Sequence, residues 1–146
     1  TPVPAERAAA QRAIFGVQRE LENIGDEREP IAVVLCDRGT IDGAAYWPGH
    51  DTLWQSLGVT RDSQLARYDA VIHLRTPAFS AYNQGNPLRI ESASEAARID
   101  YAIELAWAGH SQREFVPSEY DFLHKAHVAL TRLRSLVPAC CRPESD

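Results

Sequence analysis

The chain has 146 residues, of which 45% are hydrophobic and 24% are charged, so its composition is that of one globular domain and not of a disordered or fibrous protein. Its 20 acidic and 15 basic side chains give a net charge of −5, which argues against duplex DNA binding through bulk charge, because phosphate affinity depends on clustered Lys and Arg. No apolar run approaches the roughly 20 residues that cross a membrane, and the first residues do not resemble a signal peptide. We therefore expect a cytoplasmic protein that binds neither nucleic acid nor a membrane.

The first predicted element is a helix over residues 4–24. Pro4 suits its first turn and Gly25 its end. Its apolar residues recur at steps of four and three, the spacing of one helical face; they are Ala10, Ile14, Val17, Leu21 and Ile24. We expect this face to pack against the core.

Two short apolar runs, 31–36 and 70–74, predict strands buried on both faces. Between them, Pro48-Gly49 ends a short helix or turn over residues 40–47, and two short helices are expected at 51–57 and 62–68.

The second half begins with a long loop at 76–91, rich in Pro, Gly and Asn. Ser92 and Glu95 form a capping-box pattern that predicts a helix closed by Gly109. Its apolar face is Ala96, Ile99, Ile103 and Ala106. A short strand at 115–116 follows, and then a helix that begins near Ser118 and Asp121, with an apolar face made by Phe122, Ala126, Ala129, Leu133 and Leu136.

Buried strands separated by helices predict an α/β domain with a parallel sheet, whose ligands bind at the carboxyl ends of the strands. Both longer predicted strands end there in charged residues. Asp37 and Arg38 follow the first, and Arg75, a candidate substrate-binding residue, follows the second.

The segment from Asp37 to Asp42 is the sharpest local feature. An aspartate directly after a buried strand can hold Mg²⁺ or polarise an attacking group, as in phosphate-transfer folds. Arg38 could bind an anionic substrate, and Asp42 adds a second carboxylate. A structural interpretation is also open, in which Asp37 caps the following turn and Arg38 pairs with Asp42.

A second group of charged residues lies around the long loop. Arg89 and Arg98 could close over a triphosphate and neutralise developing charge. Alternatively, Arg98 is a solvated residue paired with Glu95. Asp100 lies near the edge of the apolar face, where a carboxylate needs a partner, and an ion pair within the lid is expected.

The five histidines show no metal-ligand spacing. His73 is expected to be a hydrogen-bonded core residue. No G-x-S-x-G motif supports hydrolase chemistry of the Ser/His/Asp type.

Three segments carry a family resemblance: Cys36-Asp-Arg-Gly-Thr-Ile-Asp-Gly-Ala-Ala-Tyr-Trp47, Tyr68-Asp-Ala-Val-Ile-His-Leu-Arg-Thr76 and Asn86-Pro-Leu-Arg-Ile-Glu-Ser92. In this order they resemble the AAA-type ATP-binding domain related to the NadR nucleoside kinases, over about residues 12–136. That resemblance implies a three-layer α/β P-loop NTPase-like fold with a mostly parallel sheet, forming a single domain over 1–146 with a lid around 76–108.

The resemblance also implies roles for individual residues. Asp37 matches the Walker B-type or catalytic aspartate, with Mg²⁺ as its metal. Arg38 and Asp42 would face the acceptor site, and Arg89 and Arg98 would be the phosphate-facing arginines of the lid.

One part of the pattern is not found in the 146 residues. Related proteins begin with a strand and a G-x-x-x-x-G-K-[ST] loop that cradles the phosphates, but this sequence has no Gly-Lys pair and its one lysine is Lys125. Since Met is also absent, we expect the first strand, the P-loop and its helix to lie upstream of Thr1. The other interpretation is a naturally degenerate molecule that keeps the fold for another purpose.

We therefore expect the intact protein to bind ATP with Mg²⁺, and to hydrolyse it or transfer its γ-phosphate to an unidentified small acceptor. Residues 1–146 alone are expected to be inactive and to bind nucleotide weakly. The alternative function is a nucleotide-switched or degenerate regulatory or interaction module without catalysis. A missing strand and helix would expose apolar surface, so a homo-oligomer is also anticipated.

Overall fold

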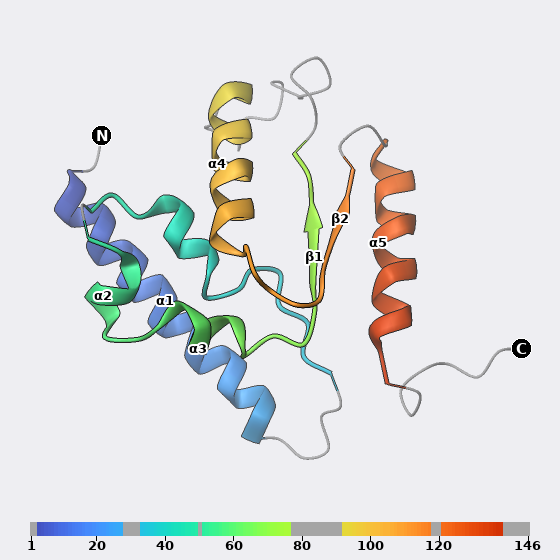
Figure 1. Ribbon diagram of the computed structural model, residues 1–146, viewed down its shortest axis with the longest axis horizontal. Coiled ribbons are helices and arrows are strands. Elements are labelled where there is room, and N and C mark those ends of the chain that lie inside the picture. The colour runs from blue at the N-terminus through green and yellow to red at the C-terminus, as the bar shows by residue number, and fades with distance from the viewer. Residues whose placement is uncertain (1–2, 28–32, 50, 77–91, 118–120, 139–146) are drawn as a thin grey trace, which may run out of the picture. The chain divides into compact units, whose positions relative to one another are not determined.

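The computed structural model describes residues 3–27, 33–49, 51–76, 92–117 and 121–138 (Figure 1). The chain divides into two compact units, Thr1–Tyr68 and Asp69–Asp146, called unit 1 and unit 2 below. Each unit is described by itself, and the single domain expected over 1–146 stays a prediction. None of the helices in the described ranges is long and apolar enough to cross a membrane.

Unit 1 is helical. Helix α1 covers Pro4–Glu27, the 3-10 helix η1 covers Asp42–Tyr46, and two short helices follow, α2 over Leu53–Leu57 and α3 over Arg61–Leu65. All four elements were predicted from the sequence. Helix α1 continues two residues beyond Gly25, the expected stop, and α3 ends earlier than the predicted 62–68.

Side-chain caps determine where the short helices begin. Thr52 accepts a hydrogen bond from the Gln55 amide at 3.2 Å, and Gln55 accepts one from the Thr52 amide at 2.9 Å, which is a complete capping box. Thr60 caps α3 in the same way through the Ser63 amide. Gly58, at φ +65°, ends α2 in a left-handed conformation that glycine adopts without a steric penalty.

The orientation of α1 contradicts the sequence prediction. The apolar face expected in the core is solvent-exposed, with Ile14 at 57% and Leu21 at 60%. Over residues 4–24 of α1, the buried residues are Phe15, at 6%, and Glu22, at 8%. Phe15 joins Ile41 and Leu53 as the buried apolar residues of unit 1, and polar groups around Glu22 complete the interior.

The strand predicted at 31–36 is also not observed where the structure describes it. Residues 33–36 have no regular secondary structure, and Leu35 is 66% exposed. A strand needs a hydrogen-bonded neighbour, and no ladder involving 33–36 occurs among the described residues. Residues 31 and 32 lie outside the described ranges.

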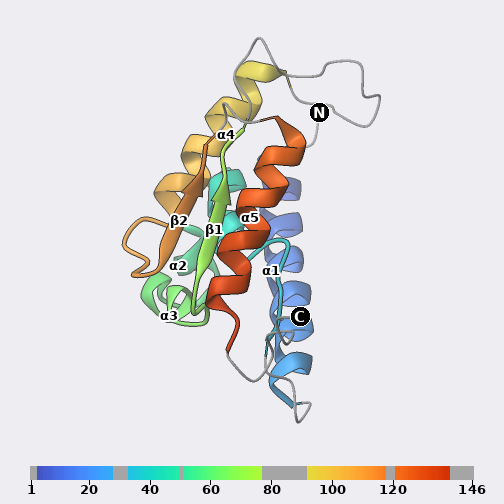
Figure 2. The same ribbon diagram turned by 90° about the vertical axis from the view of Figure 1, so that its right-hand side faces the viewer.

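Unit 2 contains the sheet. Strand β1, Val71–Leu74, pairs in parallel with β2, Arg113–Val116, in the register Val71↔Arg113 to Leu74↔Val116. Helix α4, Ala93–Ala106, connects them, and α5, Phe122–Leu136, follows β2. Figures 1 and 2 show α4 and α5 on opposite faces of this sheet. The α/β class and the parallel pairing are therefore confirmed for a sheet of two strands.

The helices of unit 2 match the sequence more closely. Ser92 caps α4 by accepting from the Glu95 amide at 3.2 Å, and Ala96 and Ile99 are buried as expected. Asp121 caps α5 through the His124 amide at 2.9 Å. Phe122 departs from its predicted apolar face, since 81% of it is exposed. Ser118, the other predicted cap, lies outside the described residues.

Candidate functional site

The predicted Asp37–Asp42 segment of unit 1 is anchored at one end and exposed at the other. Thr40 and Ile41 are buried, at 3% and 0%, whereas Asp37 and Arg38 are exposed in a bend. Within the described ranges the Asp37 carboxylate has no hydrogen-bond or ion-pair partner. The segment therefore presents a carboxylate to solvent from a held backbone.

A groove of about 260 Å³ lies beside this segment. Its lining comes from α1, from the segment itself and from η1: Gln11, Ile14, Phe15, Gln18, Arg38, Gly39, Thr40, Asp42, Gly43 and Tyr46. It combines an aromatic and aliphatic surface with amide and charged groups, the composition common in small-molecule sites. Two predicted substrate-binding residues, Arg38 and Asp42, are thus brought to one groove.

Arg38 and Asp42 also form an ion pair, as the structural interpretation predicted. Arg38 Nη1 lies 3.6 Å from Asp42 Oδ2, and the Arg38 side chain is 56% exposed while that of Asp42 is 14% exposed. Such an exposed pair contributes little to stability. Arg38 can therefore turn toward an anion at small cost.

A buried polar network that the sequence did not predict lies behind the segment. The Glu22 carboxylate accepts hydrogen bonds from Gln18 Nε2 at 2.8 Å, from the Tyr68 hydroxyl at 2.8 Å and from Arg67 Nη2 at 2.9 Å. Tyr68 in turn accepts from the Thr40 amide at 2.6 Å. These contacts connect α1 to the start of the candidate segment.

The environment of Glu22 changes the acidity of two neighbours. Burial raises the pKa of the Tyr68 hydroxyl to about 12, and the negative charge of Glu22 acts in the same direction, while hydrogen bonds to Thr40 oppose it. Partial burial, followed by the charge of Glu22, raises the pKa of the Cys36 thiol. Both side chains therefore stay protonated at neutral pH.

The residues present fit a minimal magnesium site. Mg²⁺ at nucleotide sites is commonly bound through one or two carboxylates together with substrate phosphates and water. The exposed, unpaired carboxylate of Asp37 fits such a role. A group of three His, Cys, Asp or Glu side chains that could hold a metal alone does not occur in the described part of the chain.

In unit 2, Arg75 lies at the carboxyl end of β1 and is engaged by two carboxylates of α4. Its Nε is 3.3 Å from Asp100 Oδ2, and its Nη1 pairs with Glu104. Asp100 also bonds His73 Nε2 at 3.1 Å and accepts from the Thr76 amide at 3.2 Å. The predicted need of Asp100 for a partner and the core role of His73 are confirmed. Arg75 is held by ion pairs with Asp100 and Glu104, and its role in substrate binding stays a prediction.

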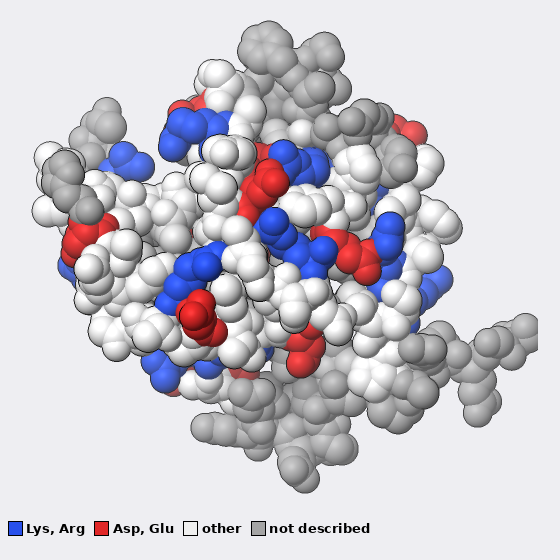
Figure 3. Space-filling view, in the orientation of Figure 1, with Lys and Arg blue, Asp and Glu red and all other residues white. Residues whose placement is uncertain are grey.

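Opposite charges alternate on the face of unit 2 that is seen in Figure 3. Figure 3 shows acidic and basic side chains next to one another over β1, β2 and α5. One such contact is the ion pair between Arg132 of α5 and Glu114 of β2. A surface of this kind lacks the single-sign field that concentrates a charged ligand.

The arginines predicted for the lid are only partly described. Arg98 is exposed and pairs with Glu95, its Nη2 lying 2.7 Å from Glu95 Oε1, which confirms the solvated alternative for its local environment. Arg89 lies outside the described residues. Because Arg98 is in unit 2 and Asp37 in unit 1, their approach to each other stays a prediction.

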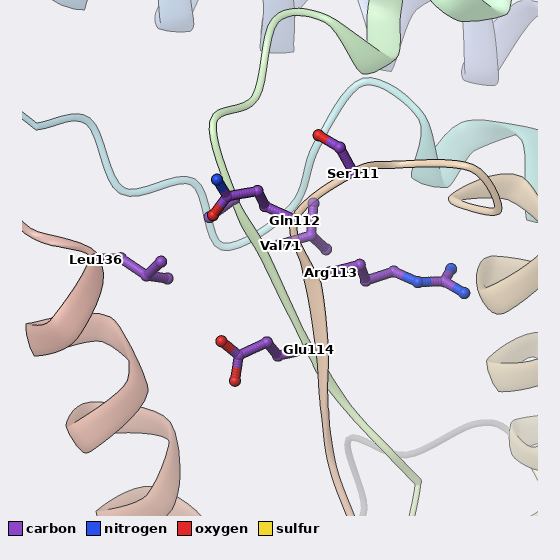
Figure 4. Close-up of a pocket in the computed structure, with 7 residues that line it drawn as sticks. Val71, Ser111, Gln112, Arg113, Glu114 and Leu136 are labelled. Atoms are coloured by element: carbon purple, nitrogen blue, oxygen red, sulfur yellow. The ribbon is translucent and has the colours of Figure 1, made fainter.

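A second hollow, of about 320 Å³, lies in unit 2 at the amino ends of the strands (Figure 4). Val71 and Gln112 line it, and Glu114 points into it, whereas the Arg113 side chain points away and donates to the Glu104 carbonyl at 2.6 Å. Ligands of parallel sheets bind at the opposite, carboxyl ends. This hollow is therefore not favoured as a ligand site, and the groove of unit 1 stays the candidate because Arg38 and Asp42 line it.

Comparison with known proteins identifies the family of this chain. A family model described as AAA domain matches residues 2–118. No curated protein and no solved structure matches the chain. The matched range contains the groove of unit 1, both strands and α4. The chain therefore belongs to this family of AAA domains, and membership implies nucleotide binding of the P-loop NTPase type.

Proposed function

We propose that this chain is the acid and acceptor part of an ATP-binding NTPase or small-molecule kinase, which hydrolyses ATP or transfers its γ-phosphate in the intact protein. Asp37 would orient the metal or activate the acceptor, while Arg38 and Asp42 would position the acceptor in the groove. Arg89 and Arg98 would bind the phosphates. The relation to the NadR nucleoside kinases belongs to the same proposal.

One observation carries this proposal: a backbone segment held by buried Thr40 and Ile41 carries the unpaired Asp37 carboxylate one residue before Arg38, which lines the groove together with Asp42. A carboxylate free of ion pairs is available to a proton or a cation. Bound Mg²⁺ would supply charge neutralisation for the phosphates. The chain itself would supply the fixed position of the carboxylate and an apolar wall that excludes water from the acceptor.

The test compares Asp37→Asn with Asp69→Asn in the natural full-length protein. Asp69 is exposed and follows Tyr68, so its replacement serves as a matched control. We expect Asp37→Asn to lower ATP turnover by about 100-fold or more, as loss of general acid–base or metal-orienting groups does, and Asp69→Asn to leave turnover unchanged. Equal ATPase and acceptor-phosphorylation rates in both variants would refute the assignment.

A second candidate, an interaction module that forms homo-oligomers without catalysis, is favoured by the exposed face of α1. Ile14, Val17 and Leu21 lie on this face, each more than half exposed. Contiguous apolar surface of this kind commonly marks an interface. Light scattering of the wild-type protein and of Val17→Gln tests this candidate, because the module requires an oligomer that Val17→Gln weakens. ATP turnover, which the module lacks, separates it from the first candidate.

A further inference from the structure

Among the carboxylates of unit 1 whose burial the structure describes, that of Glu22 is the most enclosed, and nothing in its local sequence indicates this. Its side chain is 9% exposed, and it accepts hydrogen bonds from α1 and from the residues that follow α3. A buried charge is tolerated only when donors compensate it. Here Gln18, Arg67 and Tyr68 all provide donors, so the fold retains a costly group with full compensation.

Two of these donors also hold the segment that carries Asp37. Gln18 Nε2 donates to the Arg38 carbonyl at 2.7 Å as well as to Glu22. The Tyr68 hydroxyl donates to Glu22 and accepts from the Thr40 amide. Glu22 therefore orients Gln18, which hydrogen-bonds the backbone at residue 38, and Tyr68, which hydrogen-bonds the backbone at residue 40.

The same contacts define one wall of the groove. Gln18, Arg38 and Thr40 all line it, and each is bound to Glu22 directly or through one intermediate side chain. The Thr40 hydroxyl also donates a hydrogen bond to Gln64 Oε1 of α3 at 3.3 Å. The backbone of residues 38–40 is thus held from two elements, and Asp37 is the first residue beyond the held stretch.

We infer that Glu22 is a positioning residue for Asp37. It does not enter the groove and touches no reacting group. It fixes Gln18 and Tyr68, and through them the backbone from which the Asp37 carboxylate projects. Misplacing a catalytic group by about 1 Å can cost about 100-fold in rate, so the precision of this hold matters for turnover. The inference rests on the proposed function of Asp37.

The first test does not depend on activity. Hydrogen–deuterium exchange of the Thr40 amide is compared in the wild type, in Glu22→Gln and in Glu20→Gln, a control on the exposed side of the same helix. The Ser56 amide, bonded to the Thr52 carbonyl at 3.2 Å, reports the general stability of unit 1. We expect Glu22→Gln to accelerate exchange at Thr40 by roughly tenfold without a matching change at Ser56, as local opening requires. Equal protection of Thr40 in all three proteins would overturn the inference.

The second test uses turnover of the natural full-length protein. We expect Glu22→Gln to lower kcat about tenfold and to leave KM for ATP within about twofold, because a positioning defect affects the reacting geometry and not nucleotide affinity. In an Asp37→Asn background, Glu22→Gln should have no additional effect. A kcat no lower than that of Glu20→Gln, or additive losses in the double variant, would overturn the inference.

Tyr68→Phe covers the case in which Glu22→Gln does not fold. It removes only the hydroxyl that joins Glu22 to Thr40, and the same changes in Thr40 exchange and kcat are expected; unchanged values would contradict the inference. If Asp37→Asn itself retains full turnover, the proposed function fails, while the exchange data still decide whether Glu22 holds the segment.

Discussion

At the scale of single residues, two enclosed carboxylates organise the described parts of the molecule. Glu22 gathers donors in unit 1, and Asp100 gathers His73, Arg75 and the Thr76 amide in unit 2. The sequence indicated that Asp100 needs a partner, because it lies near an apolar helix face. It gave no such indication for Glu22, since the face of α1 that bears it contains mostly polar residues.

Tyr68 makes the stability of unit 1 sensitive to alkaline pH. Its pKa is about 12 in the folded state and about 10 when unfolded, so the unfolded state releases a proton first. The neutral hydroxyl therefore contributes fully to the free energy of unfolding below pH 10, and this contribution is lost as the pH rises toward 12. We expect chemical denaturation at pH 9 and pH 11 to show a steeper loss of stability for the wild type than for Tyr68→Phe. Equal losses would show that Tyr68 ionises normally.

Asp100 is expected to be a stability determinant of unit 2. Asp100→Asn weakens the contacts with Arg75 and His73, so a buried imidazole and a guanidinium lose an ionic partner. Losing such a partner costs about 1–3 kcal/mol of the free energy of unfolding. Urea denaturation measures this loss. Asp69→Asn serves as the control, and a similar value for both variants would contradict the role assigned to Asp100.

At the scale of secondary-structure elements, α1 shows the limit of helical periodicity. Ala10, Ile14, Val17 and Leu21 are spaced by four, three and four residues, and so are Gln11, Phe15, Gln18 and Glu22. Each set lies along one face of the helix, and the two faces are about 100° apart around its axis. Hydrophobicity favoured the first set, but Phe15 and Glu22 of the second set are buried and its two glutamines are half-buried. Arg67, Tyr68 and the Arg38 carbonyl offer this second face polar partners.

The orientation of α1 can be tested by truncating adjacent residues. Phe15→Ala removes a buried ring and is expected to cost about 3–5 kcal/mol of the free energy of unfolding. Ile14→Ala, at an exposed position, is expected to change stability by about 0.5 kcal/mol or less. Denaturant titration of both variants supplies the comparison. A larger loss for Ile14→Ala would restore the apolar face as the core face.

The strands show a related limit. The runs at 31–36 and 70–74 have similar apolar compositions, yet only the second forms a described strand, β1, which pairs with β2. A short apolar run indicates that a segment can form a buried strand, but it does not show whether a neighbouring strand is available to pair with it. The caps of α4 and α5 were better predicted, because Ser92 and Asp121 act on backbone amides only three residues away. The caps Thr52 and Thr60 in unit 1 were not predicted.

At the scale of the whole molecule, the match to AAA domains includes residues of both units and agrees with the resemblance predicted from the three motifs. The α/β class and the grouping of Arg38 with Asp42 were also predictable. The expected contact of Asp37 with Arg89 and Arg98 stays a prediction, because Arg89 lies outside the described residues and Arg98 belongs to the other unit.

Nucleotide affinity of residues 1–146 provides the test at this scale. The sequence has no Gly-Lys pair, the signature of the loop whose lysine and backbone amides bind phosphates in P-loop proteins. We expect calorimetry on this chain to give a dissociation constant for ATP weaker than about 1 mM, a free energy of binding smaller than about 4 kcal/mol. Micromolar binding would show that the phosphate site lies within these residues.

The sequence alone determined the helices of the described residues, the first caps of α4 and α5, one of the two longer predicted strands and the family, because these depend on neighbours within a few residues or on motifs that stay contiguous. Only the tertiary structure decided which face of α1 is buried and that Glu22 lies behind the candidate segment. Burial of a side chain depends on groups distant in the sequence, here Arg67 and Tyr68, which lie 45 and 46 residues from Glu22. The spacing of residues along a helix does not predict such partners.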